Sequence, residues 1–323
     1  MINIIKKNKD LFPVLIALLF MTILAVNKDF SAFTIDGIKM YFYFLLPSLF
    51  PYFFLVTILS LLKGVGKLSK LFSPISSRLF KVNGACGYAY FMSLIAGYPI
   101  GASLIADFKN SRLISSVEAE RGSVLCSTSS PAYLISTVGA IMFESVIFGA
   151  VLFLCHLLSS ITIGIIFSFY KKDKPTLLTS FSAKKTDEIL FDGITGAVNS
   201  TLFVGAIITL FYILTEILYS LGLLNLPINI LTAIFKDQNV SLAIVFALFE
   251  NGKGMKFLSS LGTNRLSFVL SCFLCGFSGL SIILQSVVYL KRAKIKIAPF
   301  ILSKIMVAII NLVYGLILAF IFF

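Results

Sequence analysis

Long apolar runs, separated by short polar or basic segments, fill most of the chain. The longest runs cover residues 11–26, 38–62 and 146–170; one more begins near Asp192 and another closes the chain. An α-helix needs about 20 mostly apolar residues to cross a hydrocarbon core about 30 Å thick. The pattern therefore predicts an all-α polytopic membrane protein.

The first apolar run follows three lysines, Lys6, Lys7 and Lys9. A cleaved signal peptide would have the same order of charge and apolar core, with cleavage near Ser31 and Ala32. We favour an uncleaved first helix, because no clear cleavage motif follows the run whereas further apolar runs do. The lysines then hold the N-terminus in the cytoplasm, since positive residues concentrate on that side of membrane helices.

The next run, residues 38–62, contains Pro47 and Pro51, so we expect a kinked helix. Residues 63–81 then interleave lysine and arginine with leucine, isoleucine and phenylalanine. This spacing predicts an amphipathic segment, broken at Pro74, that lies in the headgroup region on the cytoplasmic side. A plain cytoplasmic loop is the alternative.

Residues 84–96 are apolar but too short to span the core, and after Gly97-Tyr98-Pro99 a second short run ends near Asp107. Lysine or arginine flanks both ends of this pair. The pattern predicts a re-entrant hairpin that enters from the cytoplasm and returns to it. One long kinked span is the alternative, and it would place Lys109 and Arg112 outside.

A helix that begins near Ile114 carries Glu118 and Glu120 in its first turns, where acidic residues suit the helix dipole. A run of serine and threonine at residues 127–130, followed by Pro131, interrupts this helix, which then resumes. We therefore predict one membrane crossing made of two half-helices.

The second half of the chain repeats this order of elements. Asp192-Gly193-Ile194 opens a long span as Asp36-Gly37-Ile38 does in the first half. A second hairpin follows with its break at residues 250–254, and a second interrupted crossing has its break at residues 276–279. Basic residues at 291–296 follow that crossing, whereas the first interrupted crossing starts from the basic side. The two halves are thus predicted to run in opposite senses.

The predicted fold is an all-α membrane protein with an inverted structural repeat, two re-entrant helical hairpins and two discontinuous transmembrane helices. An N-terminal transmembrane helix takes residues 1–35, the first repeat 36–170, a cytoplasmic linker 171–188 and the inverted second repeat 189–323. Inverted repeats with paired discontinuous helices are typical of secondary transporters, whose sites lie near the bilayer midplane.

Composition narrows the choice of class. The 323 residues are 58% hydrophobic and 13% charged, with a mean hydropathy of +1.00 and 33 phenylalanines, which excludes an ordinary soluble domain. The formal charge of +13 is spread in short clusters between apolar runs, so we predict no nucleic-acid binding. The five cysteines lie in or beside apolar stretches and are expected to be buried thiols.

The candidate substrate-binding residues are those at the four breaks, where hydroxyls, amides and freed backbone groups gather. They are Gly97, Tyr98, Pro99, Ser127, Thr128, Ser129, Ser130, Glu250, Asn251, Ser278, Gly279, Ser281 and Gln285. Each could merely bond a neighbouring helix, and a structural pair of Glu250 with Lys253 is the alternative to a functional carboxylate. A lone intramembrane histidine, His156, is left without an assigned role.

The chain carries no catalytic motif, so we expect no enzymatic activity. It has no H-E-x-x-H, no nucleophile elbow and no pair of convergent aspartates. Cys272 and Cys275 form a single C-x2-C pair without a second pair, which favours helix packing over metal or redox chemistry. No cofactor and no metal are predicted.

Four ordered motifs resemble the sporulation integral membrane protein YlbJ family, part of a nucleoside-recognition or Gate-domain superfamily distantly similar to concentrative nucleoside transporters. The motifs are Pro47-Ser48-Leu49-Phe50-Pro51, Ala96-Gly97-Tyr98-Pro99-Ile100-Gly101-Ala102, the Glu118-Ala119-Glu120-Arg121 run that leads into residues 126–131, and Gly276-Phe277-Ser278-Gly279-Leu280-Ser281. The resemblance covers most of the chain from about Asp36 onward.

The resemblance implies a role in the sporulation of endospore-forming bacteria and re-entrant hairpins of the nucleoside-transporter kind. Glu250-Asn251-Gly252 resembles a polar hairpin tip of those transporters. Lys253 and Lys256 beside it depart from the pattern and suit an anionic solute better than a coupling cation.

The expected function is a sporulation-associated transporter or permease of a small polar or anionic solute. A membrane protein of spore-envelope or cortex morphogenesis that binds partners without transport is the alternative. We expect a multi-pass protein of the bacterial cell membrane with a cytoplasmic N-terminus and contact with the lipid bilayer. Homo-oligomerisation stays open.

Overall fold

The computed structural model describes residues 29–61, 65–171, 175–176 and 189–323. The predicted first span and most of the predicted linker lie outside these residues. The described part of the chain forms helices and no strands, which confirms the all-α class. In order, the elements are α3 (Phe30–Lys39), η1 (Met40–Leu45), α4 (Leu46–Leu61), α5 (Val65–Ile75), η2 (Ser76–Phe80), α6 (Gly84–Ala96), α7 (Ile100–Asn110), α8 (Ser116–Leu125), η3 (Ala132–Met142), α9 (Val146–Phe167), α10 (Ile189–Ser220), α11 (Asn225–Phe235), α12 (Gln238–Phe249), α13 (Asn251–Ser259), α14 (Arg265–Phe277), α15 (Leu280–Arg292) and α16 (Ala298–Phe322), where η1, η2 and η3 are π-helical.

Five helical segments of the described chain are long and apolar enough to cross a membrane. They are Phe30–Leu61, Val146–Phe167, Ile189–Ser220, Arg265–Arg292 and Ala298–Phe322. Their outer faces expose large apolar side chains such as Tyr43, Leu202 and Phe320, as a lipid-facing surface requires. The chain is therefore a multi-pass integral membrane protein in contact with the bilayer.

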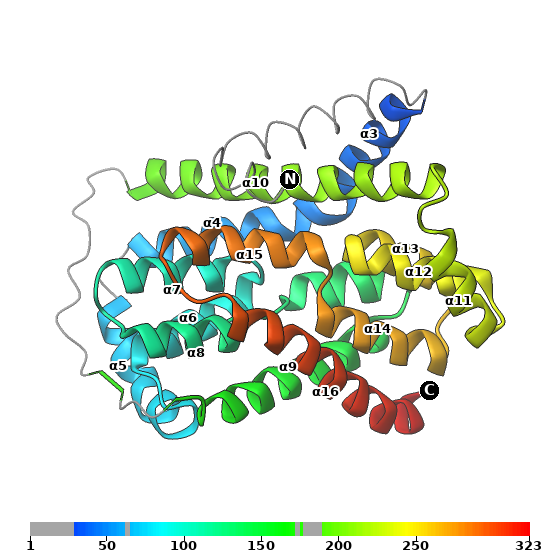
Figure 1. Cartoon of the computed structure of the whole chain (residues 1–323). Coiled ribbons are helices and arrows are strands. Elements are labelled where there is room, and N and C mark those ends of the chain that lie inside the picture. Colours follow the sequence, from blue (N-terminus) through cyan, green and yellow to red (C-terminus); the bar gives the residue numbers. More distant parts are fainter. Residues whose placement is uncertain (1–28, 62–64, 172–174, 177–188) are drawn as a thin grey trace, which may run out of the picture.

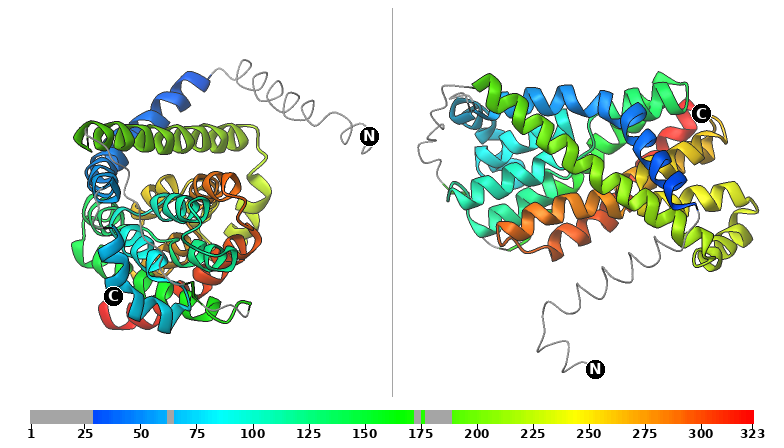
Figure 2. Two further views of the ribbon diagram at one scale, coloured as in Figure 1. Left: turned by 90° about the vertical axis from the view of Figure 1, so that its left-hand side faces the viewer. Right: turned by 90° about the horizontal axis from the view of Figure 1, so that it is seen from above.

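Helices from the two halves of the chain pack against each other on both sides of the bundle. The long helix α10 lies along α3 and α4 at one side of the bundle, and α16 packs against α9 and α14 at the other (Figures 1 and 2). Short helices fill the space between these layers. The buried core is thus shared by residues from both halves.

Helix α3, η1 and α4 form one continuous helical stretch through both prolines. A proline removes one backbone donor and its ring presses on the preceding turn. The π-helical turns of η1 lie directly before Pro47, and such wide turns are one way in which a helix accommodates an interruption of its regular hydrogen bonds.

The amphipathic segment forms, but it does not break at Pro74. Helix α5 continues past Pro74 to Ile75, and the π-helical η2 follows it, so the prediction of a break there is wrong. The segment ends at Lys81, which adopts a left-handed conformation with φ of 51°. Leu71 and Ile75 are largely exposed, in keeping with an apolar face. A Cβ at Gly84 would lie 1.8 Å from the Ser69 carbonyl oxygen, so α6 packs against α5 at backbone distance.

Two helical hairpins form where short apolar runs were recognised. Helices α6 and α7 meet at residues 97–99, and α12 and α13 meet at Glu250. The second break is narrower than predicted, because the Glu250 carboxylate accepts the backbone N–H of Lys253 at 2.6 Å and so caps α13 at its first residue. Residues 251–254 are consequently helical.

Breaks between helices also occur at the two other predicted places. Residues 126–130 separate α8 from η3, so that Cys126 joins the break and Pro131 already belongs to the following helix. Between α14 and α15 the break is confined to Ser278 and Gly279, with φ of 77° and 81°, and is shorter than the predicted 276–279.

The buried charges at the start of α8 hold three segments together. Glu118 completes a capping box with Ser115 and accepts the backbone N–H of Asn83 at 2.8 Å. Arg121 donates to the carbonyl oxygens of Lys81 at 2.8 Å and Tyr170 at 2.8 and 3.0 Å. The ends of η2 and α9 are thereby fixed to α8.

We expect Arg121→Met to destabilise the protein by about 3 kcal/mol. Removal of the guanidinium leaves the partly buried carbonyl oxygens of Lys81 and Tyr170 without this donor, at about 1–3 kcal/mol for each fully buried group. Thermal unfolding of the purified protein in detergent measures the loss. The exposed Arg78, changed to Met on the neighbouring η2, is the matched control and should melt like the unaltered protein. Equal midpoints for the two variants would contradict this structural role.

Candidate functional site

The four breaks meet in the middle of the bundle. The Tyr98 hydroxyl, at the tip of the first hairpin, donates to the Ser127 carbonyl oxygen at 2.7 Å and lies 3.0 Å from the Ser278 hydroxyl oxygen. One phenol thus links the first hairpin to both interrupted helices.

The second hairpin joins the same junction through Asn251. Its side-chain oxygen accepts the Tyr133 hydroxyl at 2.7 Å, and its nitrogen donates to the Leu274 carbonyl oxygen at 3.0 Å. Tyr133 follows the break at residues 126–130, and Leu274 precedes the other interruption. Each hairpin tip is therefore bonded to both interrupted helices or to their flanks.

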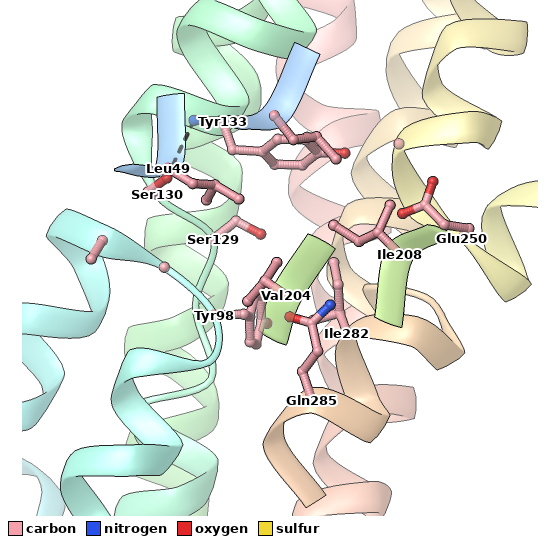
Figure 3. A pocket seen from close by; sticks show the side chains of 14 residues that line it. Leu49, Tyr98, Ser129, Ser130, Tyr133, Val204, Ile208, Glu250, Ile282 and Gln285 are labelled. Atoms are coloured by element: carbon pink, nitrogen blue, oxygen red, sulfur yellow. Dashed lines mark hydrogen bonds between the residues drawn. The ribbon is translucent and has the colours of Figure 1, made fainter. Parts of the chain in front are cut away.

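A cavity of about 50 Å³ lies between these breaks (Figure 3). The residues that line it are Leu45, Leu49, Ala96, Gly97, Tyr98, Ser129, Ser130, Tyr133, Val204, Ile208, Glu250, Gly252, Ile282 and Gln285. Such a volume holds a few water molecules at most. A larger solute can enter only if the walls move apart.

Besides the Nδ1 atom of His156, three polar side-chain atoms of the predicted residues around this junction have no hydrogen-bond partner. They are the hydroxyl oxygens of Ser127 and Ser281 and the side-chain nitrogen of Gln285. All three side chains belong to the predicted set and are at most 7% exposed. Because buried polar atoms in native proteins nearly always have partners, these atoms mark a place for water or a polar ligand.

At the tip of the first hairpin, the backbone of Gly97 lies close to the backbone of Ser130 in the first interrupted helix. Gly97 has φ of 77°, and a Cβ there would lie 2.9 Å from the Ser130 nitrogen, so glycine is required on both grounds. The Ser130 hydroxyl accepts the Tyr133 N–H at 3.2 Å, and Thr128 donates to the Ser93 hydroxyl oxygen at 2.9 Å. The hairpin tip and the interrupted helix thus support each other.

His156 is part of the structure of this break. Its Nε2 atom accepts the backbone N–H of Ser129 at 2.9 Å. A nitrogen that accepts a hydrogen bond carries no proton, so the imidazole is neutral in this arrangement. The sequence left the residue without a role, because only the packing of α9 shows what faces it.

Lys304 is the residue at the junction that the sequence analysis did not select. Its Nζ donates to the Tyr98 hydroxyl oxygen at 2.5 Å and to the Ser278 hydroxyl oxygen at 3.3 Å, and the side chain is 1% exposed. A lone lysine in the last apolar helix was the signal that could have identified it.

Glu250 does not pair with the Lys253 side chain. The Lys253 ammonium lies 2.9 Å from a Glu216 carboxylate oxygen, with angles outside those of a hydrogen bond, and 3.9 Å from the Phe246 ring centre. The structural alternative for Glu250 therefore rests on helix capping and not on an ion pair. Both lysines that suggested an anionic solute, Lys253 and Lys256, line a second, outer cavity instead.

The site gathers polar groups that can form hydrogen bonds with a ligand. Hydroxyls, amides, one carboxylate and one ammonium converge on the junction, and no group of three or more metal-ligating side chains occurs in the described part of the chain. Of the predicted residues, Gly97, Tyr98, Ser129, Ser130, Glu250 and Gln285 line the cavity, whereas Ser127, Asn251 and Ser278 bind the residues around it.

We expect His156→Leu to lower the free energy of unfolding by about 1–3 kcal/mol, because the Ser129 N–H would lose its buried acceptor. Thermal unfolding in detergent measures the change. Thr215→Val, which removes a buried hydroxyl that bonds only the Phe211 carbonyl oxygen of its own helix, is the control. The interpretation fails if the two substitutions cost the same.

Comparison with known proteins gives one informative relative. The chain is 26% identical over 328 aligned positions to the "Sporulation integral membrane protein YlbJ" of Bacillus subtilis (strain 168), covering 93% of this chain and 80% of the relative. The predicted resemblance to the YlbJ family is confirmed. No family model matches the chain. No solved structure matches it at a significant level.

Proposed function

Because this chain is a homologue of a sporulation integral membrane protein and is itself a multi-pass helical protein, we propose that it is a secondary transporter or permease. It moves a small polar or anionic solute through a site between its two halves. It acts by binding and conformational change and not as an enzyme.

The observation that carries this proposal is the convergence of four helix interruptions on buried polar atoms without partners. Hydrocarbon cannot satisfy exposed backbone groups, so non-helical backbone at membrane depth occurs where it lines a cavity or is buried in protein. Here it surrounds a cavity into which Gln285 projects (Figure 3). A solute with hydroxyl, amide or carboxylate groups can satisfy the free atoms.

Alternating access follows from the repeat architecture that we propose. The two hairpins are re-entrant and enter from opposite sides, and residues 36–170 and 189–323 form inverted repeats around the site. Positive residues at the ends of α9 and α15 are cytoplasmic, which gives a cytoplasmic N-terminus. The small cavity then corresponds to a closed arrangement that opens when one repeat moves against the other.

Within the site, the residues have distinct roles. Ser127, Ser281 and Gln285 offer hydrogen bonds to the solute, and η3 begins beside Ser130 with the positive end of its helix dipole. Glu250 fixes the second hairpin tip through its cap on α13 and lines the cavity with its carboxylate.

A ligand-binding assay tests the site. We expect one class among nucleosides, nucleotides, amino acids and peptidoglycan precursors to raise the unfolding temperature of purified protein, since a ligand at about 100 times its Kd adds about 2.7 kcal/mol. Gln285→Leu and Ser281→Ala should reduce this shift. Thr215→Val, which removes a hydroxyl bonded only within its own helix, should keep it. An equal shift in all variants would exclude this site, and binding without uptake in proteoliposomes would exclude transport.

Cysteine labelling tests the inverted arrangement. The native cysteines are buried, so single exposed cysteines at Asn110 and Thr263 can be read against a low background. We choose Thr263 because its neighbour Asn264 caps α14. Asn110→Cys should react from the cytoplasm and Thr263→Cys from outside. Reaction of both from the same side would contradict the opposite orientation of the repeats.

A further inference from the structure

Lys304 lies where the first hairpin and the two interrupted helices come together. It belongs to α16, which packs against α8, α9 and α14. Its ammonium is buried and donates to Tyr98 of the first hairpin and to Ser278 of the second interrupted helix. A single side chain therefore ties together segments from the two halves of the protein.

The acceptors of this ammonium are neutral oxygens that belong to a larger oxygen-rich group. Tyr98 in turn donates to the Ser127 carbonyl oxygen, and Ser278 lies 3.2 Å from the Cys275 carbonyl oxygen. The Nζ atom also lies 4.2 Å from the centre of the Tyr98 ring, whose face attracts a cation. Hydroxyl, carbonyl and aromatic groups are the surroundings that a desolvated cation prefers.

Among the residues that the structure describes, no carboxylate forms an ion pair with Lys304. The ion pairs of Lys171 with Glu120 and of Lys253 with Glu216 do not involve it. Of the titratable groups that face it, Tyr98 is a hydrogen-bond acceptor and His156 is neutral because its Nε2 accepts the Ser129 N–H. The positive charge needs another source of compensation, because an isolated buried charge is costly.

Helix dipoles supply that compensation. Helix α8 ends at Leu125 and α14 ends at Phe277. The Tyr98 hydroxyl bonds Ser127, which follows the C-cap residue of α8, and Ser278, which is the C-cap residue of α14. Each helix C-terminus carries roughly half a negative elementary charge. Both ends lie beside the Tyr98 hydroxyl that accepts from Lys304, so their partial negative charges favour a positive charge there.

Half-helix C-termini with unwound carbonyls are also the groups that coordinate coupling cations in transporters built from discontinuous helices. We propose that the Lys304 ammonium is a tethered cation, which occupies this place and holds the two interrupted helices and the first hairpin together. Its part in transport rests on the proposed function, whereas its part in the assembly of the junction does not. The unaltered protein consequently needs no sodium ion at this point.

Thermal unfolding with added cations tests this role without any solute. In the unaltered protein, sodium chloride and choline chloride at equal ionic strength should give the same unfolding midpoint. Lys304→Ala should lower the midpoint by roughly 5 °C or more and open a hole beside Tyr98 and Ser278. Ethylammonium should restore the midpoint in a saturable way.

Two further variants keep the outcome decisive. Lys304→Met fills the hole without a charge, so it should be destabilised and should not respond to ethylammonium. Lys296→Ala removes an exposed lysine upstream of α16 and should behave like the unaltered protein. The proposal is overturned if Lys304→Met melts like the unaltered protein, or if sodium specifically stabilises the unaltered protein. If Lys304→Ala cannot be purified, these two comparisons decide the question alone.

Failure of the solute assay leaves this result intact, because no solute is present. Conversely, loss of the tethered-cation role would leave Ser127, Ser281 and Gln285 as the solute site. The two proposals can therefore fail separately.

Discussion

A backbone N–H or C=O group in hydrocarbon has no solvent partner, and this chain interrupts its helices at four places within its apolar part. The interruptions satisfy one another. Tyr98 accepts from Lys304 and donates to Ser127, and Asn251 bridges Tyr133 and Leu274. The remaining architecture follows from this requirement, because the four breaks must lie at one point and the helices that carry them must converge there.

The same requirement explains why a few polar atoms stay free. If every polar group at the junction had a hydrogen-bond partner, the four breaks would serve only to stabilise the structure. The Gln285 nitrogen and the hydroxyls of Ser127 and Ser281 have no partner, although Tyr98, Tyr133 and Asn251 beside them are hydrogen-bonded. Leaving a buried polar group unpaired costs about 1–3 kcal/mol, and a bound polar solute or water recovers that free energy.

Much of this arrangement could be predicted from local sequence signals. Glycine, proline and serine within apolar runs revealed the positions of three breaks, because these residues interrupt or loosen helices. The fourth break lies at Glu250, whereas the neighbouring Gly252 and Gly254 are helical. The widths of the breaks were less predictable, since they depend on side-chain capping such as that of Glu250. Proline at position 74 was misleading, because a π-helical continuation can follow it. The division into inverted repeats stays a prediction.

Residues that reach the site through long-range packing could not be identified from local sequence patterns. His156 and Lys304 lie on uninterrupted helices, and no local pattern distinguishes a face that meets a break from one that meets another helix. Only the positions of α9 and α16 reveal that one binds Ser129 and the other Tyr98. Further along the same two helices, Ser159 bonds Asn311 at 3.1 Å and Thr162 bonds Tyr314 at 3.0 Å. These helices therefore join the two halves through ordinary side-chain pairs away from the junction, whereas at the junction they supply groups that the broken helices cannot supply themselves.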